Sequence, residues 1–125
     1  MKVLLVDDSA TVRHHLIELL SALPGVEILE AAQASEARHA IRSGRPDVVV
    51  LDIHMPRGSG IEVLEALRED HPRPTTIMLT NDPTPQSRAA CLRIGADFFF
   101  DKTAEFQQAV DVIARLMQAA PRPDL

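Results

Sequence analysis

The apolar run at residues 48–51, Val-Val-Val-Leu, constrains this chain more than any other segment. All four side chains are apolar and three of them are β-branched, which favours a strand buried on both faces. Strands of that kind lie in the middle of parallel sheets that helices cover on both sides. A second apolar run, at residues 3–6, opens the chain in the same way. The sequence therefore predicts a covered parallel sheet.

Amphipathic segments with helical spacing alternate with these runs. The expected strands are residues 3–6, 26–30, 48–51, 75–79 and 97–100. The expected helices carry their apolar residues within 12–23, 35–43, 61–67, 85–94 and 106–117. Pro24-Gly25 is expected to end the first helix, and Thr84 and Thr103 are placed to cap the last two.

This strict alternation predicts an α/β fold with a doubly wound, five-stranded parallel sheet and helices on both faces. Right-handed crossovers leave few arrangements, and the common one for five strands is the flavodoxin-like order 2-1-3-4-5. We expect one domain over residues 1–120 and a flexible tail over residues 121–125, which contain two prolines.

Composition excludes several classes of protein. The chain of 125 residues has a net charge of −5 and no Lys/Arg-rich run, so direct nucleic-acid binding has no support. A single cysteine excludes an intramolecular disulfide framework. No apolar stretch is long enough to be a membrane span. We expect a cytoplasmic protein.

Polar residues follow four of the predicted strands. Asp7 and Asp8 follow the first, Asp52 the third, Thr80 the fourth and Lys102 the fifth. The carboxyl ends of parallel strands meet at one edge of a sheet, so these side chains should converge there. Carboxylates held close together suit Mg²⁺, which also recruits phosphate oxygens. Zinc is disfavoured, because Cys and His do not occur at ligand spacing. Asp52 is placed as a nucleophile toward phosphorus.

With these residues the chain resembles the receiver (response regulator) family of two-component signalling, of the single-domain type related to chemotaxis regulators. The resemblance runs from Lys2 to about Gln118. Its motifs are Asp7-Asp8, Asp52, Met55-Pro56 with Gly58 and Gly60, Thr80, and Asp101-Lys102.

The resemblance implies a role for each site residue. Asp52 would accept a phosphoryl group from a sensor histidine kinase or a phosphotransfer protein. Asp8, Asp52 and the backbone carbonyl of His54 would ligate Mg²⁺, with Asp7 acting through water. Lys102 would pair with the phosphoryl oxygens, and Thr80 would move toward them.

The same resemblance implies how the signal leaves the site. Thr80 would be coupled to Phe99, and the face formed by the fourth helix, fifth strand and fifth helix would bind an unidentified downstream protein. His54 and Asp82, two positions after Asp52 and Thr80, would tune the lifetime of the phosphoryl group. A phosphorylation-dependent homodimer is left open. Many relatives have tyrosine at the position of Phe99, which here has no hydroxyl group.

Other functions stay open at this stage. The chain can be a receiver domain cut from a longer transcriptional regulator, or an interaction module on the same fold that is never phosphorylated. Asp7-Asp8 can simply cap the first helix. A phosphatase that turns over through an aspartyl phosphate usually needs a second aspartate two residues after the nucleophile, where this chain has His54. We therefore expect a phosphoryl-accepting domain and no enzyme.

Overall fold

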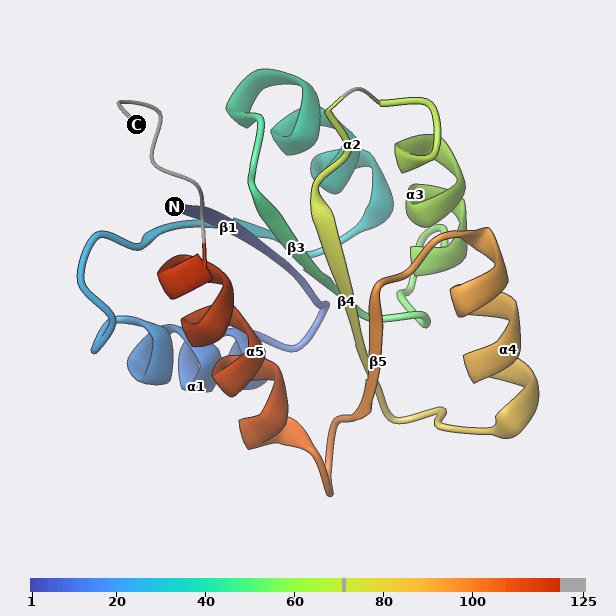
Figure 1. Ribbon diagram of the computed structural model, residues 1–125. Coiled ribbons are helices and arrows are strands. Elements are labelled where there is room, and N and C mark those ends of the chain that lie inside the picture. Colours follow the sequence, from blue (N-terminus) through green and yellow to red (C-terminus); the bar gives the residue numbers. More distant parts are fainter. Residues whose placement is uncertain (71, 120–125) are drawn as a thin grey trace.

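The computed structural model describes residues 1–70 and 72–119 and shows strands alternating with helices (Figure 1). The strands are β1 (Lys2–Val6), β2 (Glu27–Ala31), β3 (Val48–Leu51), β4 (Thr75–Thr80) and β5 (Phe98–Asp101). The helices are α1 (Ala10–Leu20), α2 (Ala34–Gly44), α3 (Gly60–Leu67), α4 (Pro85–Ile94) and α5 (Phe106–Ala119). The predicted tail at residues 121–125 lies outside the described residues.

The strands form one parallel sheet in the order β2-β1-β3-β4-β5, which confirms the predicted fold class and topology. Helices α1 and α5 cover one face of the sheet, and α2, α3 and α4 cover the other (Figure 1). The last residue of β1, Val6, lies opposite the last residue of β3, Leu51, and the last residues of β4 and β5, Thr80 and Asp101, also lie opposite each other. Leu51 pairs with Met78, so β4 extends two residues beyond the end of β3.

The core consists of two apolar layers, one on each face of the sheet. Alternate residues of β1 divide between them: Val3 and Leu5 face α1 and α5, whereas Leu4 and Val6 face the other three helices. All four residues of β3 are buried, which confirms the prediction of a central strand covered on both sides.

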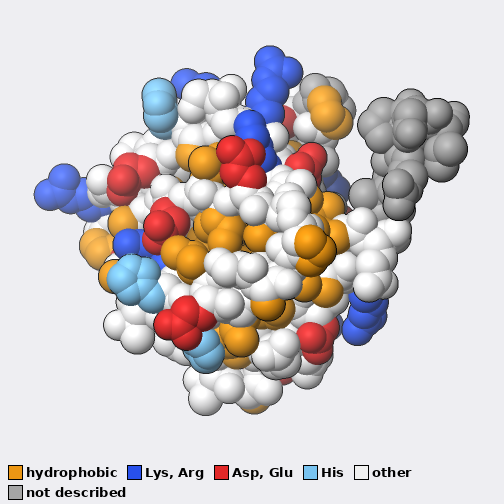
Figure 2. Space-filling view, turned by 90° about the vertical axis from the view of Figure 1, so that its left-hand side faces the viewer, with side chains coloured by type: hydrophobic (Ala, Val, Ile, Leu, Met, Phe, Trp, Pro, Cys, Tyr) orange, Lys and Arg blue, Asp and Glu red, His pale blue; other side chains and the backbone are white. Residues whose placement is uncertain are grey.

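The apolar layer beneath α1 and α5 reaches the surface at its margin. Figure 2 shows hydrophobic side chains gathered across the middle of the side of the molecule where α1 lies. Partly buried residues packed against this layer include Val12, Ile17, Leu23, Ile28 and Leu116. In the part of the chain that the structure describes, no helix combines the length and apolarity that a membrane span requires.

Two predicted helix boundaries are wrong. Helix α1 ends at Leu20, ahead of Pro24-Gly25, because the chain turns between these positions. Thr103 does not cap α5, which begins at Phe106. The carboxylate of Asp101 accepts a hydrogen bond from the Thr103 N–H at 2.8 Å, and the Asp101 carbonyl accepts one from the Glu105 N–H at 2.9 Å. This local turn uses the residues that were expected to start the helix.

Glycine at position 60 sets the distance between α3 and the end of β3. The Gly60 N–H donates to the carbonyl oxygen of Ile53 at 2.8 Å. A Cβ atom at this position would overlap the carbonyl oxygen of Asp52. The first turn of α3 therefore lies directly against the backbone of Asp52.

Replacing Gly60 with alanine should lower the free energy of unfolding by about 3 kcal/mol, because backbone must shift to admit the methyl group. Gly25→Ala is the matched control: its φ is +80°, yet no atom lies within 4 Å of the added Cβ. Its cost should be about 1 kcal/mol, from backbone strain alone. Urea unfolding followed by circular dichroism measures both, and equal costs would contradict this account.

Candidate functional site

The polar residues at the strand ends converge at one edge of the sheet, as predicted. Backbone hydrogen bonds extend the parallel ladder just beyond the strands and fix these residues. The Asp7 N–H donates to Ala31 O at 3.1 Å, the Asp52 N–H to Val6 O at 3.0 Å, and the Lys102 N–H to Thr80 O at 2.8 Å. Asp7, Asp52 and Thr80 are buried. The backbone of Asp7, Asp52 and Lys102 is therefore fixed by hydrogen bonds to the neighbouring strands.

Lys102 joins two of the aspartates. Its Nζ lies 2.7 Å from Oδ2 of Asp7 and 2.9 Å from Oδ2 of Asp52. The three side chains are only 8%, 5% and 8% exposed, in the order Lys102, Asp7 and Asp52. One buried ammonium thus neutralises part of the charge of two buried carboxylates, which would otherwise repel each other.

Burial and pairing act in opposite directions on these groups. Burial raises the pKa of the Asp7 carboxyl, and the hydrogen bonds from Lys102 and from the Ser9 N–H offset only part of that rise. Burial alone would lower the pKa of Lys102, but its hydrogen bonds to Asp7 and Asp52 outweigh burial and raise it. The ammonium is therefore firmly charged, and the ionised form of Asp7 is held at a cost.

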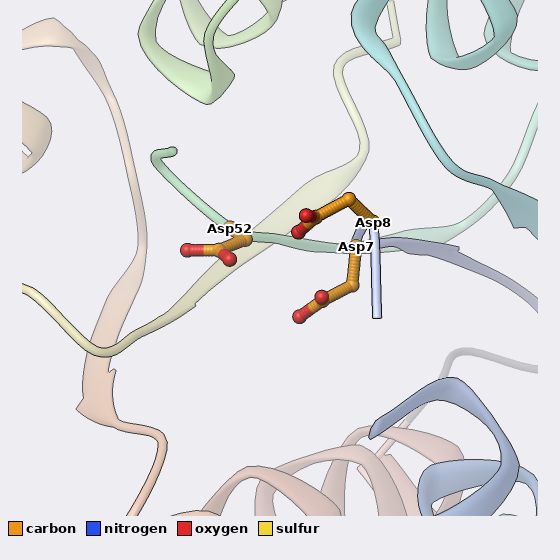
Figure 3. Close-up of side chains that lie close together, drawn as sticks. All are labelled: Asp7, Asp8 and Asp52. Carbon is orange, nitrogen blue, oxygen red and sulfur yellow. The ribbon is translucent and has the colours of Figure 1, made fainter. Parts of the chain in front are cut away.

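A third carboxylate completes the acidic group. Asp7, Asp8 and Asp52 each offer one oxygen, and these oxygens all lie within 4.8 Å of one another. Figure 3 shows the side chains of Asp7 and Asp8 extending toward Asp52. Asp8 is exposed, so the group is open to solvent on its side. An all-oxygen, partly open set of this kind fits Mg²⁺, which keeps several waters.

The structure explains how the Asp7-Asp8 backbone is positioned. Ser9, and neither aspartate, caps α1, with its Oγ accepting from the Val12 N–H at 3.2 Å. The alternative that the aspartates serve as the helix cap is therefore wrong. Arg13 of α1 donates to the carbonyl oxygen of Asp7 at 2.5 Å. Sequence reasoning missed Arg13, because helical spacing does not show which way an arginine side chain returns.

Thr80 and the predicted tuning residues lie in one hydrogen-bonded group. Thr80 is fully buried, and its Oγ1 accepts from the Asp82 N–H at 3.1 Å. The ring Nε2 of His54 lies 2.7 Å from Oδ2 of Asp82, although the His54 side chain is 70% exposed. This hydrogen bond lowers the pKa of Asp82. Ser87, which the sequence did not single out, also donates to Oδ2 of Asp82 at 3.1 Å.

Phe99 lies in the core beneath α4 and is 4% exposed. Arg88 of α4 places its guanidinium 5.8 Å from the centre of the Phe99 ring and donates to the Phe99 carbonyl oxygen at 3.2 Å. The sequence pointed to Phe99 as a switch residue coupled to Thr80 and did not identify Arg88 as its partner. A cation over the ring and a backbone bond together fasten α4 to β5.

Replacing Asp7 with asparagine should raise the free energy of unfolding at pH 7 by about 1 kcal/mol in metal-free buffer. A carboxyl whose pKa is raised by folding binds its proton more tightly in the folded chain, so its ionised form destabilises the fold above that pKa. Lys102 keeps Asp52 as its partner.

Urea unfolding in the presence of a chelator measures this change. Asp8→Asn, at an exposed position, should shift stability by less than about 0.5 kcal/mol and serves as the control. A less stable Asp7→Asn variant would contradict the assignment of Asp7 as a group held ionised at a cost.

Comparison with known proteins agrees with this geometry. The family model of the response regulator receiver domain matches residues 3–114. A protein-glutamate methylesterase/protein-glutamine glutaminase of Agrobacterium fabrum is 45% identical over 98 residues, which are 76% of this chain and 28% of that protein. A protein of the same name from Geobacter metallireducens is 45% identical over 82 residues, 65% of this chain and 24% of that protein.

Among solved structures, the response regulator domain of Thermotoga maritima CheB has a TM-score of 0.80 and 28% identity, with 96% of this chain and 95% of that one covered. The chain spans 24% and 28% of the length of the two relatives given above. The likeness to these two relatives therefore concerns only a part of their length.

Proposed function

Because this chain belongs to the response regulator receiver domain family, we propose that it accepts a phosphoryl group on Asp52 in a Mg²⁺-dependent reaction. The donor is a sensor histidine kinase or a phosphotransfer protein. The observation that carries the proposal is the Lys102 ammonium bound to Asp52 within a cluster of three carboxylates. A family match alone does not carry it, since a receiver fold can also serve as a constitutive interaction module.

Asp52 is suited to the nucleophilic role. Lys102 occupies its Oδ2, and in the described residues no hydrogen bond is made to its Oδ1. One Asp52 oxygen forms the new P–O bond while the bond from phosphorus to the donor's leaving atom breaks. The ammonium of Lys102 lies where it can pair with a phosphoryl oxygen, as electrostatic stabilisation of this transfer requires.

Asp8 and Asp52 would hold the metal directly, together with the backbone carbonyl of His54, and Asp7 would hold it through water. The metal supplies positive charge to the phosphoryl oxygens when it is bound. The hydroxyl of Thr80 supplies a further donor. His54 and Asp82 would tune the lifetime of the phosphoryl group, and their contact with each other supports a joint action.

In this proposal the phosphorylated domain acts as a signal to a partner protein. The domain itself does not turn over a separate substrate as an enzyme does. We assign the output to the face formed by α4, β5 and α5, where Leu92 of α4 is 41% exposed and would contact a downstream protein. Phosphorylation-dependent pairing of two copies through the same face is compatible with this assignment. A cytoplasmic setting is part of the proposal, since histidine kinases deliver phosphoryl groups there.

A second candidate follows from the relatives. The chain aligns with part of protein-glutamate methylesterases that are much longer than the aligned segment. The same site can therefore serve as the receiver portion of a longer regulator, whose phosphoryl state controls an attached enzyme. This differs from a stand-alone receiver in where the output domain lies and not in the chemistry at Asp52.

Replacing Asp52 with asparagine should abolish phosphoryl transfer from acetyl phosphate, because the amide is no nucleophile toward phosphorus. Incorporation of labelled phosphate in the presence and absence of Mg²⁺ measures this. Asp47→Asn is the matched control: Asp47 is an exposed aspartate at the other end of β3 and should change nothing. Equal labelling of wild type and Asp52→Asn would overturn the proposal.

Replacing Asp8 with asparagine should weaken Mg²⁺ binding by about tenfold or more, because one of the anionic oxygen ligands is lost. Isothermal titration calorimetry with MgCl₂ measures the affinity without labelling, which matters in a chain that has neither Trp nor Tyr. Asp47→Asn again provides the control. Unchanged affinity in Asp8→Asn would show that the metal binds elsewhere.

A further inference from the structure

Asp82 connects three segments that meet near the acidic group formed by Asp7, Asp8 and Asp52. Its carboxylate Oδ2 lies 2.7 Å from the His54 ring and accepts from the Ser87 hydroxyl at 3.1 Å. Its backbone N–H donates to Oγ1 of Thr80 at 3.1 Å. One residue thereby joins the loop after Asp52, the end of β4 and the first turn of α4.

The bond to Thr80 uses only half of what its hydroxyl offers. A threonine hydroxyl has one proton to donate as well as an oxygen that accepts. The oxygen accepts from Asp82, and in the described part of the chain the hydroxyl donates to no protein group. Thr80 ends β4 at the same edge as Asp52 and is fully buried, so this hydroxyl proton would be free to donate to a phosphoryl oxygen on Asp52. Any turn of Thr80 toward Asp52 must stretch the bond to Asp82 or draw Asp82 along.

A movement of Asp82 would affect helix α4, because Asp82 is hydrogen-bonded to that helix. Ser87 lies in the first turn of α4 and is bound to the Asp82 carboxylate through its hydroxyl. The next residue, Arg88, contacts the carbonyl oxygen and the ring of Phe99. A continuous series of contacts therefore runs from Thr80 through Asp82 and Ser87 to Arg88 and β5.

A simple capping role does not account for Ser87. The cap of α4 is Thr84, whose hydroxyl accepts from the Ser87 N–H at 3.1 Å. The Ser87 hydroxyl points away from the helix backbone to a carboxylate two residues before that cap. A capping serine would instead accept from a free N–H of the helix.

We propose that Asp82 and Ser87 are positioning residues that carry the displacement of Thr80 to helix α4. The inference rests on the proposed phosphorylation of Asp52 and specifies how its effect reaches the output face. It gives this chain a route that does not need a hydroxyl on residue 99, which is phenylalanine here. The coupling consists of the hydrogen bond from the Asp82 backbone N–H to Thr80 and the one from the Ser87 hydroxyl to the Asp82 carboxylate. The contact of the His54 ring with the same carboxylate adds a third bond.

The test compares Mg²⁺ and beryllofluoride titrations of ¹⁵N-labelled wild type, Ser87→Ala and Ser87→Thr by NMR. In wild type, amide signals should shift both at residues 52–54 and 80–82 and at residues 88–94 of α4. In Ser87→Ala the site signals should shift as before, with beryllofluoride affinity within about twofold of wild type. The α4 shifts should fall below about half of their wild-type size. Ser87→Thr, which keeps the hydroxyl, should restore them.

Ser43→Ala is the matched control, because that hydroxyl binds only the carbonyl oxygen of His39 within α2 among the described residues, and its removal should leave α4 unaffected. If Ser87→Ala does not fold, Ser87→Cys provides the same test with a weaker donor of similar shape. Wild-type-sized α4 shifts in the variant that lacks the hydroxyl would overturn the coupling. The absence of any Mg²⁺-dependent response in wild type at residues 52–54 would instead overturn the proposed function.

Discussion

The pairing of the Lys102 ammonium with two buried carboxylates is the interaction on which the rest of the structure depends. Taking two aspartates out of water is costly, and Asp7 and Asp52 are buried at the same edge of the sheet. Lys102 lies within 2.9 Å of both and makes this arrangement possible. With Asp8 included, the edge still carries two negative charges in excess. A divalent cation would match that excess, so the charge that Lys102 leaves unbalanced supports the proposed binding of Mg²⁺.

The same pairing bears on how the site would respond to the proposed phosphorylation. Lys102 has Asp52 as its partner in the resting chain, and phosphorylation would attach to one Asp52 oxygen a group with three further oxygens and more negative charge. The ammonium of Lys102 would then gain acceptors, while the backbone of Lys102 stays bound to the Thr80 carbonyl oxygen through its backbone N–H. Phosphorylation would thus change the charge at Asp52, whose backbone is held by the sheet. Its structural consequences would appear in the more exposed loops.

The sequence predicted the features that burial and topology determine. Apolar runs indicated the strands, and the rule that the carboxyl ends of parallel strands meet at one edge predicted that Asp7, Asp52, Thr80 and Lys102 lie together. Contacts that depend on the course of individual side chains could not be predicted in this way. Arg13 returning to the Asp7 carbonyl and Ser87 reaching back to Asp82 leave no periodic signal. The turn organised by Asp101, which displaced the expected cap at Thr103, belongs to the same class.

The side chains of the site fall into a buried group, with Asp7, Asp52 and Lys102, and a more exposed group, with His54 and Asp82. The side chains of Asp7, Asp52 and Lys102 are at most 8% exposed, whereas those of His54 and Asp82 are 70% and 32% exposed. Water competes with the hydrogen bond between His54 and Asp82, because both side chains are at least partly exposed. The loop before α4 should therefore open at a lower free-energy cost than the hydrogen-bonded strands of the sheet. The charge change that the proposed phosphorylation would bring to Asp52 would therefore have its effect at the solvated end, where α4 begins. The proposed direction of the signal, from Asp52 toward α4, agrees with this difference in exposure.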